Sequence, residues 1–333
     1  MKDLSLPTEV EEMANINTPY KWTLGRELAA KAEKELGETP RVREAALAKI
    51  KSRMKERSDI NFRRDDRFIL RFLRAKKFEV DRSFKTLVKY YELKEKHPDF
   101  FKDYKPSSIA HVLDDGFPVV LDLPDNDGRP ILALKVSKWN ASEYNIIDIA
   151  KAVFMAMEML IESEKNQING VVLLADLEGI GLSHAMQLTP GFARKVTAIF
   201  QNCVPVRLQG IHFVNEPLVF SGVYHILKPF MQDKIRKRVQ VHGRTYSSLH
   251  QYLPADALPS DYEGKTGPYT NEGWRARFLA LDPVFEENFS FGIQKKSKGS
   301  KKKGTEKHAK EIKEKEVKTS TDKDDHKRKT HTL

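Results

Sequence analysis

Residues 210–217 read Gly-Ile-His-Phe-Val-Asn-Glu-Pro, and this stretch decides the fold class. The apolar run has the length of a buried strand and ends at a proline. An amphipathic segment follows over residues 218–230, and basic residues then gather over 234–238. A buried strand that leads into a movable apolar helix with positive charge beside it suits a protein that opens toward an anionic membrane. The same pattern suits a nucleotide-dependent enzyme poorly.

Outward from this stretch, the chain alternates between strand and helix patterns. Strands are predicted over residues 118–123, 130–136, 171–177, 211–214 and 238–242, and helices over 146–165, 189–202 and 218–230. The Asn-Asp-Gly of residues 126–128 predicts a hairpin turn between the first two strands. The order strand, helix, strand, helix, strand predicts a largely parallel sheet covered by helices.

The first hundred residues have a different pattern. Helices are predicted over residues 23–36, 42–54, 64–75 and 81–96, each with apolar residues on one side. The expected organisation is an irregular N-terminus over 1–18, a helical module over 19–97, an α/β domain over 98–270, an extension over 271–294 and a tail over 295–333.

Composition narrows the class of protein. Of the 333 residues, 40% are hydrophobic and 32% charged, which is ordinary for a globular protein in water. No apolar run approaches the roughly 18 residues that span a bilayer. The single cysteine, Cys203, excludes an internal disulfide framework and a multi-cysteine zinc site. We therefore expect an intracellular, cytoplasmic protein.

Charge is concentrated at the C-terminal end. From Lys295 onward, fifteen Lys and Arg face seven Asp and Glu, so this segment carries +8 of the chain's +11. Its large apolar residues are Ile312, Val317 and Leu333, too few to offset the entropy of ordering. We expect a disordered basic arm.

Motifs for catalysis or cofactor binding are incomplete. Gly179-Ile180-Gly181 follows a strand pattern, but His184 stands where a dinucleotide-binding loop needs its third glycine. Gly264-Lys265-Thr266 resembles the end of a phosphate loop, yet Pro259 occupies the position of its first glycine. The histidines lack metal-ligand spacing. We expect no enzymatic activity, no cofactor and no metal.

The helix predicted over 146–165 carries an apolar face and several methionines. Such a face usually belongs to a plain hydrophobic core. Methionines at Met155, Met157, Met159 and Met186 also suit a cavity wall, because flexible thioethers adapt to apolar ligands. Both interpretations stay open on the pattern alone.

The basic residues also allow two interpretations. Lys234 and Arg238 are four residues apart and would share a helical face, and Arg207 could approach them just before the strand at Ile211. They could form a solvated surface. They could instead bind an anionic headgroup, with Arg207 as a planar fork on phosphate.

Taken together, these motifs resemble the CRAL-TRIO lipid-transfer family, in the branch of alpha-tocopherol transfer protein, the clavesins and cellular retinaldehyde-binding protein. The resemblance runs from about Asp65 to Gly264. Its matching segments are 68–75 (Phe-Ile-Leu-Arg-Phe-Leu-Arg-Ala), 176–179, 183–184, 188–190, 210–217, 228–230, 242–243 and 258–264.

The resemblance implies a helical module and an α/β domain that encloses an apolar ligand cavity, closed by a gate helix after Pro217. By similarity, the cavity would be lined by Val153, Phe154, Met157, Val171, Ile180, Leu182, Met186, Leu188, Val196, Ile199, Phe200 and Ile211. Basic residues beside the gate bind a phosphatidylinositol bisphosphate in the family's tocopherol carrier. The matching positions here are Lys76, Arg207, Lys234 and Arg238.

Three departures bear on the ligand. Gln209 replaces a further basic residue of that headgroup site, and Ile180 replaces a tryptophan of the tocopherol carrier. Val206 stands where phosphatidylinositol-exchanging members have a glutamate, although Lys228 is retained. Tocopherol itself and a headgroup buried in the cavity are therefore both disfavoured.

The expected function is a non-enzymatic carrier that holds a hydrophobic small molecule and docks reversibly on phosphoinositide-bearing membranes. The first alternative is a phosphoinositide-binding scaffold or trafficking protein that acts through the basic face and tail. The tail lacks interleaved aromatic residues, so no specific nucleic acid is expected. The second alternative is a nucleotide-dependent oxidoreductase.

Overall fold

The computed structural model describes residues 20–22, 24–202 and 204–294. The irregular N-terminus predicted over 1–18 and the tail predicted over 295–333 lie outside the described residues. Within the described part, no helix is both long enough and apolar enough to cross a membrane.

The described residues before position 97 form a bundle of helices, as predicted. Its helices are α2 (Arg26–Leu36), α3 (Pro40–Lys55), α4 (Asp66–Ala75) and α5 (Val80–Lys96). Thr39 caps α3 through its side chain, and Pro40 occupies the first helical position, where no amide donor is needed. Asp65 caps α4 in the same way. The rings of Phe68 and Phe72 on α4 meet edge to face, 5.3 Å between centroids, inside the bundle.

The central sheet of the described chain has the strand order β2-β3-β4-β5-β6. Its strands are β2 (Val119–Val120), β3 (Ile131–Lys135), β4 (Val171–Asp176), β5 (Leu208–Val214) and β6 (Val239–Val241). β2 pairs with β3 in the antiparallel sense across the predicted hairpin turn, and every later pair is parallel. The predicted mixed α/β fold with a mostly parallel sheet is confirmed.

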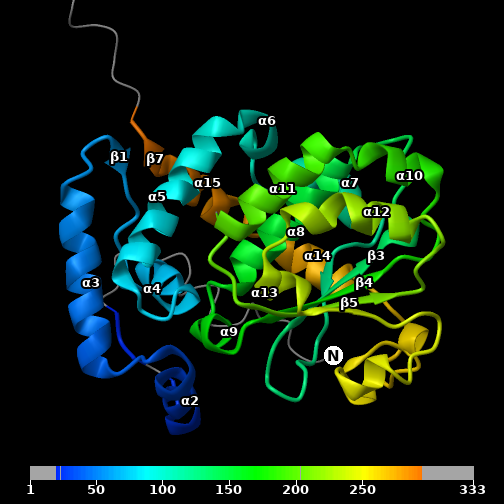
Figure 1. Ribbon diagram of the computed structural model, residues 1–333, viewed down its shortest axis with the longest axis horizontal. Helices are drawn as coiled ribbons and strands as arrows, with labels where there is room; N and C mark the ends of the chain where they lie inside the picture. Colours follow the sequence, from blue (N-terminus) through cyan, green and yellow to red (C-terminus); the bar gives the residue numbers. More distant parts are fainter. Residues whose placement is uncertain (1–19, 23, 203, 295–333) are drawn as a thin grey trace, which may run out of the picture. The chain divides into compact units, whose positions relative to one another are not determined.

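The helices of the α/β part are α6 (Pro98–Phe101), α7 (Ala110–Asp114), α8 (Ile146–Leu160), α9 (Glu164–Asn169), α10 (Leu182–Gln187), α11 (Pro190–Asn202), α12 (Phe220–Leu227) and α13 (Asp233–Arg236). Figure 1 shows α8, α11 and α12 gathered on the same side of the sheet. The prediction of a single helix over 146–165 is wrong in one respect, since α8 ends at Leu160 and α9 is a separate helix. α10 was not predicted at all.

Gly170 ends α9 and brings two parts of the α/β domain into close contact. Its backbone is left-handed, with φ +88°. A Cβ at this position would lie 2.4 Å from the Arg207 carbonyl oxygen, so no other residue fits. This approach lets the Val171 amide donate to the Arg207 carbonyl at 2.9 Å. Arg207 is thereby fixed beside α9, at the start of β5.

The residues predicted as an extension form α14 (Glu272–Leu279), α15 (Asp282–Ser290) and β7 (Gly292–Ile293). β7 pairs in the antiparallel sense with β1 (Ile60–Asn61), so the chain returns to the helical module. One hydrophobic cluster runs from Phe68 of the module through Leu132 of the sheet to Phe278 of α14. A small separate cluster of Ala32, Leu36 and Ile168 attaches α2 to α9.

Candidate functional site

The start of α12 is anchored at the carboxyl ends of the parallel strands. Asn215, directly after β5, has a left-handed backbone with φ +54°. Its amide donates to the Gly243 carbonyl at 2.8 Å, and its side-chain Nδ2 donates to Asp176 Oδ1 at 2.9 Å. Asp176 is almost fully buried at the end of β4. A fixed polar pivot therefore precedes α12.

α12 itself is apolar, yet none of its residues is buried. Phe220 meets Phe213 of β5 with ring centroids 5.0 Å apart and stacks on Tyr224. Leu218, just before the helix, is 99% exposed. An apolar helix with this much residual exposure rests on its neighbours without completing a packed core, as a cover would.

The predicted cavity residues fall into three groups. Phe154, Met157, Val171, Leu188, Ile199 and Ile211 are buried, whereas Val153, Ile180, Val196 and Phe200 are partly exposed. Phe154 of α8 and Phe200 of α11 meet edge to face at 5.8 Å, which joins the two helices above the sheet. Leu182 and Met186 differ from the expectation, since α10 leaves them 69% and 66% exposed.

A pocket of ≈ 180 Å³ lies elsewhere, between the edge strand β2 and α14. Its wall includes Val120, Pro259 and Trp274, and it contains none of the predicted cavity residues. This pocket is therefore separate from the region beneath α12.

The predicted basic residues Lys76, Arg207, Lys234 and Arg238 lie close enough to repel one another. Partial burial lowers the pKa of Lys234, and the charges of Arg238, Arg207, Lys77 and Lys76 lower it further. Burial and the charge of Arg207 likewise lower the pKa of Arg238. We call these five residues, with Lys77 included, the basic cluster. Sequence reasoning missed Lys77, although it directly follows Lys76.

Among the described residues, Arg207 differs from the rest of the basic cluster because its guanidinium forms an ion pair. Its Nη2 lies 2.7 Å from Glu35 Oε2 on α2, and its Nη1 donates to the Ile168 carbonyl. Sequence reasoning also missed Glu35, since nothing in the pattern of α2 separates it from the other acids there. Among the described residues, Lys76 and Lys234 form no ion pair.

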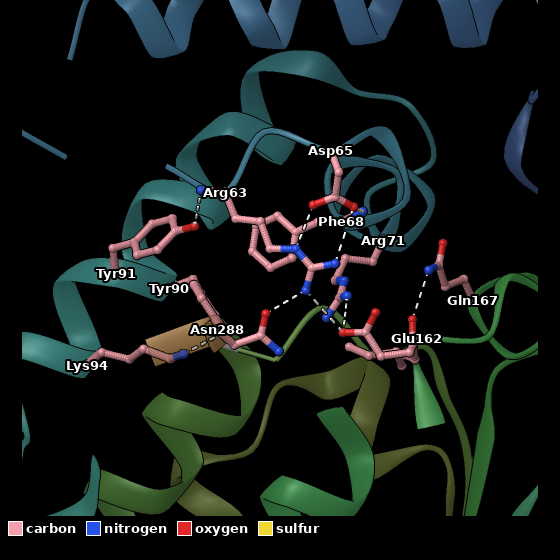
Figure 2. Close-up of polar contacts among 11 residues, drawn as sticks. Arg63, Asp65, Phe68, Arg71, Tyr90, Tyr91, Lys94, Glu162, Gln167 and Asn288 are labelled. Carbon is pink, nitrogen blue, oxygen red and sulfur yellow. Dashed lines mark hydrogen bonds and ion pairs between the residues drawn. The ribbon is translucent and has the colours of Figure 1, made fainter. Parts of the chain in front are cut away.

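A second group of cations joins the helical module to the α/β domain (Figure 2). Arg63 lies 2.6 Å from Asp65 and donates to Asn288 of α15 at 2.5 Å, and Arg71 pairs with Glu162. Behind them, Arg74 pairs with Glu38 and Glu164 at 2.8 and 2.7 Å. We call the three arginines with their acids Glu38, Asp65, Glu162 and Glu164 the buried ion network.

Below the pivot, two histidines form a buried pair. His212 Nδ1 lies 2.9 Å from His242 Nε2, and the two rings are stacked. His242 Nδ1 is in turn 2.6 Å from Ser248 Oγ. Burial, followed by the neighbouring His242, lowers the pKa of His212 to about 4. The pair is therefore neutral at pH 7 and links β5 to the segment after β6.

The comparisons with known proteins agree with this architecture. Residues 114–264 match the model of the CRAL/TRIO domain, and residues 39–110 match that of the Pinta-like UBA domain. Together with relatives that are 36–38% identical over 80–84% of this chain, the CRAL/TRIO match shows that the chain belongs to the CRAL-TRIO family. Family and relatives support a lipid-binding transfer protein.

Similar proteins within this family carry two kinds of name. The human alpha-tocopherol transfer protein-like protein is 38% identical over 271 residues, 81% of this chain and 79% of that protein. Clavesin-1 of Xenopus laevis is 38% identical over 270 residues, 80% of this chain and 81% of its own. Human clavesin-2 is 36% identical over 282 residues, 84% and 86% of the two chains.

Proposed function

We propose that this protein is a non-enzymatic carrier of a hydrophobic small molecule, which it exchanges at membranes that contain phosphoinositides. The cargo would be tocopherol-like, retinoid-like or another isoprenoid or lipid. It would lie beneath α12, against the faces of α8 and α11 that carry Phe154 and Phe200. Apolar burial would supply most of its affinity.

The observation that carries the proposal is that two residues of the basic cluster, Lys234 and Arg238, follow the apolar cover closely in the chain. Only residues 228–232, which include a short 3-10 helix, separate α12 from α13, which carries Lys234. Positive charge and an incompletely buried apolar helix therefore occupy one continuous segment. A membrane with anionic headgroups would attract the first and provide an apolar phase for the second.

Two further observations support the proposal. The fixed pivot at Asn215 gives α12 a defined point from which to move. The names of the similar proteins include a tocopherol transfer protein-like member, which supports a cargo of that chemical class here. Attraction of about 1 kcal/mol for each basic residue near an anionic surface keeps such docking reversible.

Lys76→Ala with Lys234→Ala tests the proposal without removing any ion pair of the described structure. Loss of two such charges should weaken binding to phosphatidylinositol bisphosphate vesicles by roughly 30-fold. Vesicle co-sedimentation measures this change. Native mass spectrometry of the same preparations, purified from the protein's own cells, should show an apolar cargo retained in both the wild type and the variant.

The matched control is Lys49→Ala with Lys55→Ala, two exposed lysines of α3. It removes the same charge from another helix and should leave vesicle binding within about twofold, because isolated exposed charges are screened by salt. Equal loss in both double variants would contradict docking through the basic cluster. A wild-type protein that neither contains nor takes up any apolar molecule would contradict the carrier function.

A further inference from the structure

The turn between α4 and α5 has an unusual backbone. Lys77 and Phe78 are consecutive residues with left-handed conformations, φ +52° and +58°, and neither is glycine. Such residues are uncommon singly, and strained backbone persists where the surroundings hold it, often at functional sites. Backbone hydrogen bonds hold this turn: the Phe78 amide donates to the Leu73 carbonyl at 2.8 Å, the Lys77 amide to the Arg74 carbonyl at 3.2 Å, and the Glu79 amide to the Lys76 carbonyl at 3.1 Å.

The side chain of Phe78 fixes where the turn lies. Phe78 packs against the small cluster of Ala32, Leu36 and Ile168. The carbonyl of Ile168 accepts a hydrogen bond from Arg207. A path of contacts through Phe78 and Ile168 therefore leads from the turn to Arg207 of the basic cluster. Lys77 directly precedes Phe78 and has an exposed side chain.

Electrostatic effects also connect Lys77 with the other residues of the basic cluster. It is one of the cations whose charge lowers the pKa of Lys234, after burial, Arg238 and Arg207. The helical module thus contributes Lys76 and Lys77 to a surface whose other cations come from the α/β domain.

Arg207 leaves little room for a ligand on its own side of the surface. Its guanidinium is bound to Glu35 and to a backbone carbonyl, and its side chain is 11% exposed. Glu38, three residues further along, is fully buried against Arg74, so the chain beside Glu35 is firmly held. The lysines on the other side, Lys76, Lys77 and Lys234, carry ammonium groups that form no ion pair within the described residues.

We infer that Lys77 is a further phosphoinositide-binding residue, and that the inositol phosphate lies between the α4–α5 turn and α13. This inference rests on the proposed function and deepens it. The ligand class is an inositol ring that bears phosphomonoester groups, each with a charge of about −1.5 to −2 at pH 7. Lys77 would compensate for Gln209, an uncharged residue beside Arg207 on β5. The seam between module and domain would then determine which headgroup binds.

Lys77→Met tests the inference, because methionine keeps most of the side-chain length and loses the charge. Binding to phosphatidylinositol bisphosphate vesicles should weaken roughly fivefold, and binding of soluble inositol 1,4,5-trisphosphate should weaken similarly. Lys77→Arg should retain binding within about twofold. Lys85→Met, an exposed lysine of α5, is the matched control and should behave like the wild type.

The outcomes separate this inference from the proposed function. If Lys76→Ala with Lys234→Ala weakens vesicle binding but Lys77→Met resembles Lys85→Met, the inference fails and the proposed function stands. If Lys77→Met weakens binding to phosphatidylserine vesicles of matched charge as much, the inference also fails, because Lys77 then adds only general surface charge. The urea midpoint should be the same for both Met variants, which excludes a loss of fold.

Discussion

The buried ion network and the basic cluster are built from the same residue types and have opposite electrostatic character. Burial alone would lower the pKa of Arg74, but its hydrogen bond to Glu38 and the charge of Glu164 raise it. In the basic cluster, burial lowers the pKa of Lys234 and neighbouring cations lower it further. The first region contains its own counter-ions, whereas in the second, among the described residues, only Arg207 forms an ion pair, with Glu35. Paired cations hold the helical module and the α/β domain together, and the unpaired lysines of the basic cluster belong to the proposed anion site.

The strongest test of the difference between the two regions is to remove one acid from the buried ion network. Glu38→Gln keeps the side-chain shape and leaves Arg74, which is fully buried, with less negative charge around it. We expect a loss of roughly 3–5 kcal/mol in the free energy of unfolding, measured by urea denaturation.

Its matched control is Glu79→Gln, which removes an exposed partner of Arg82. An exposed pair contributes about 0–1 kcal/mol, so this variant should unfold close to the wild-type midpoint. Equal effects of the two variants would show that burial does not distinguish the network.

A second test concerns the buried histidine pair, which is neutral at pH 7. The folded pKa of His212 is about 4, below its ordinary value of 6.5. Between these values the unfolded chain binds more protons, so stability is complete above pH 6.5 and falls as the pH drops toward 4. The expected loss is about 3 kcal/mol.

Urea midpoints measured from pH 7 to pH 4 check this prediction. His212→Asn should show a clearly shallower decline over that interval, because the titrating group is gone. His225→Asn, at an exposed position on α12, is the control and should keep the wild-type slope. Parallel curves for all three proteins would rule out His212 as the cause.

The smallest expected effect is on the stability of the basic cluster itself. Lys234→Ala removes an exposed cation that its neighbours repel and that has no ion pair among the described residues. We expect the free energy of unfolding to stay within about 0.5 kcal/mol of the wild type or to rise slightly. A loss above about 1 kcal/mol in urea denaturation would mean that Lys234 stabilises the fold.

Much of the fold could be predicted from local patterns. The strand at 171–177 is apolar except for Asp176, so its central place in a parallel sheet follows from composition. The separation of α9 from α8 was missed because the break after Leu160 contains no glycine or proline to mark it. β2 is only two residues long, although the apolar run is longer, because pairing at a sheet edge depends on the partner and not on propensity.

The candidate site was predicted less completely, for physical reasons. The charges of Lys76, Arg207 and Arg238 act on Lys234, so these residues lie near one another, and their role in headgroup binding stays a prediction. Glu35 is paired with Arg207 only because α2 folds back onto α9, a tertiary contact that no spacing indicates. Leu182 and Met186 have the residue types of a cavity wall, but exposure depends on which face of α10 meets its neighbours.

The pairing of β1 with β7 bears on cooperativity. Ile60 of β1 and Ile293 of β7 are paired although they lie far apart in the sequence. Nearby, Asn288 accepts a hydrogen bond from Arg63. Fraying of the module therefore disrupts the last strand at the same time. The module and the α/β domain should consequently behave as one thermodynamic unit, in which damage at either end is transmitted to the other.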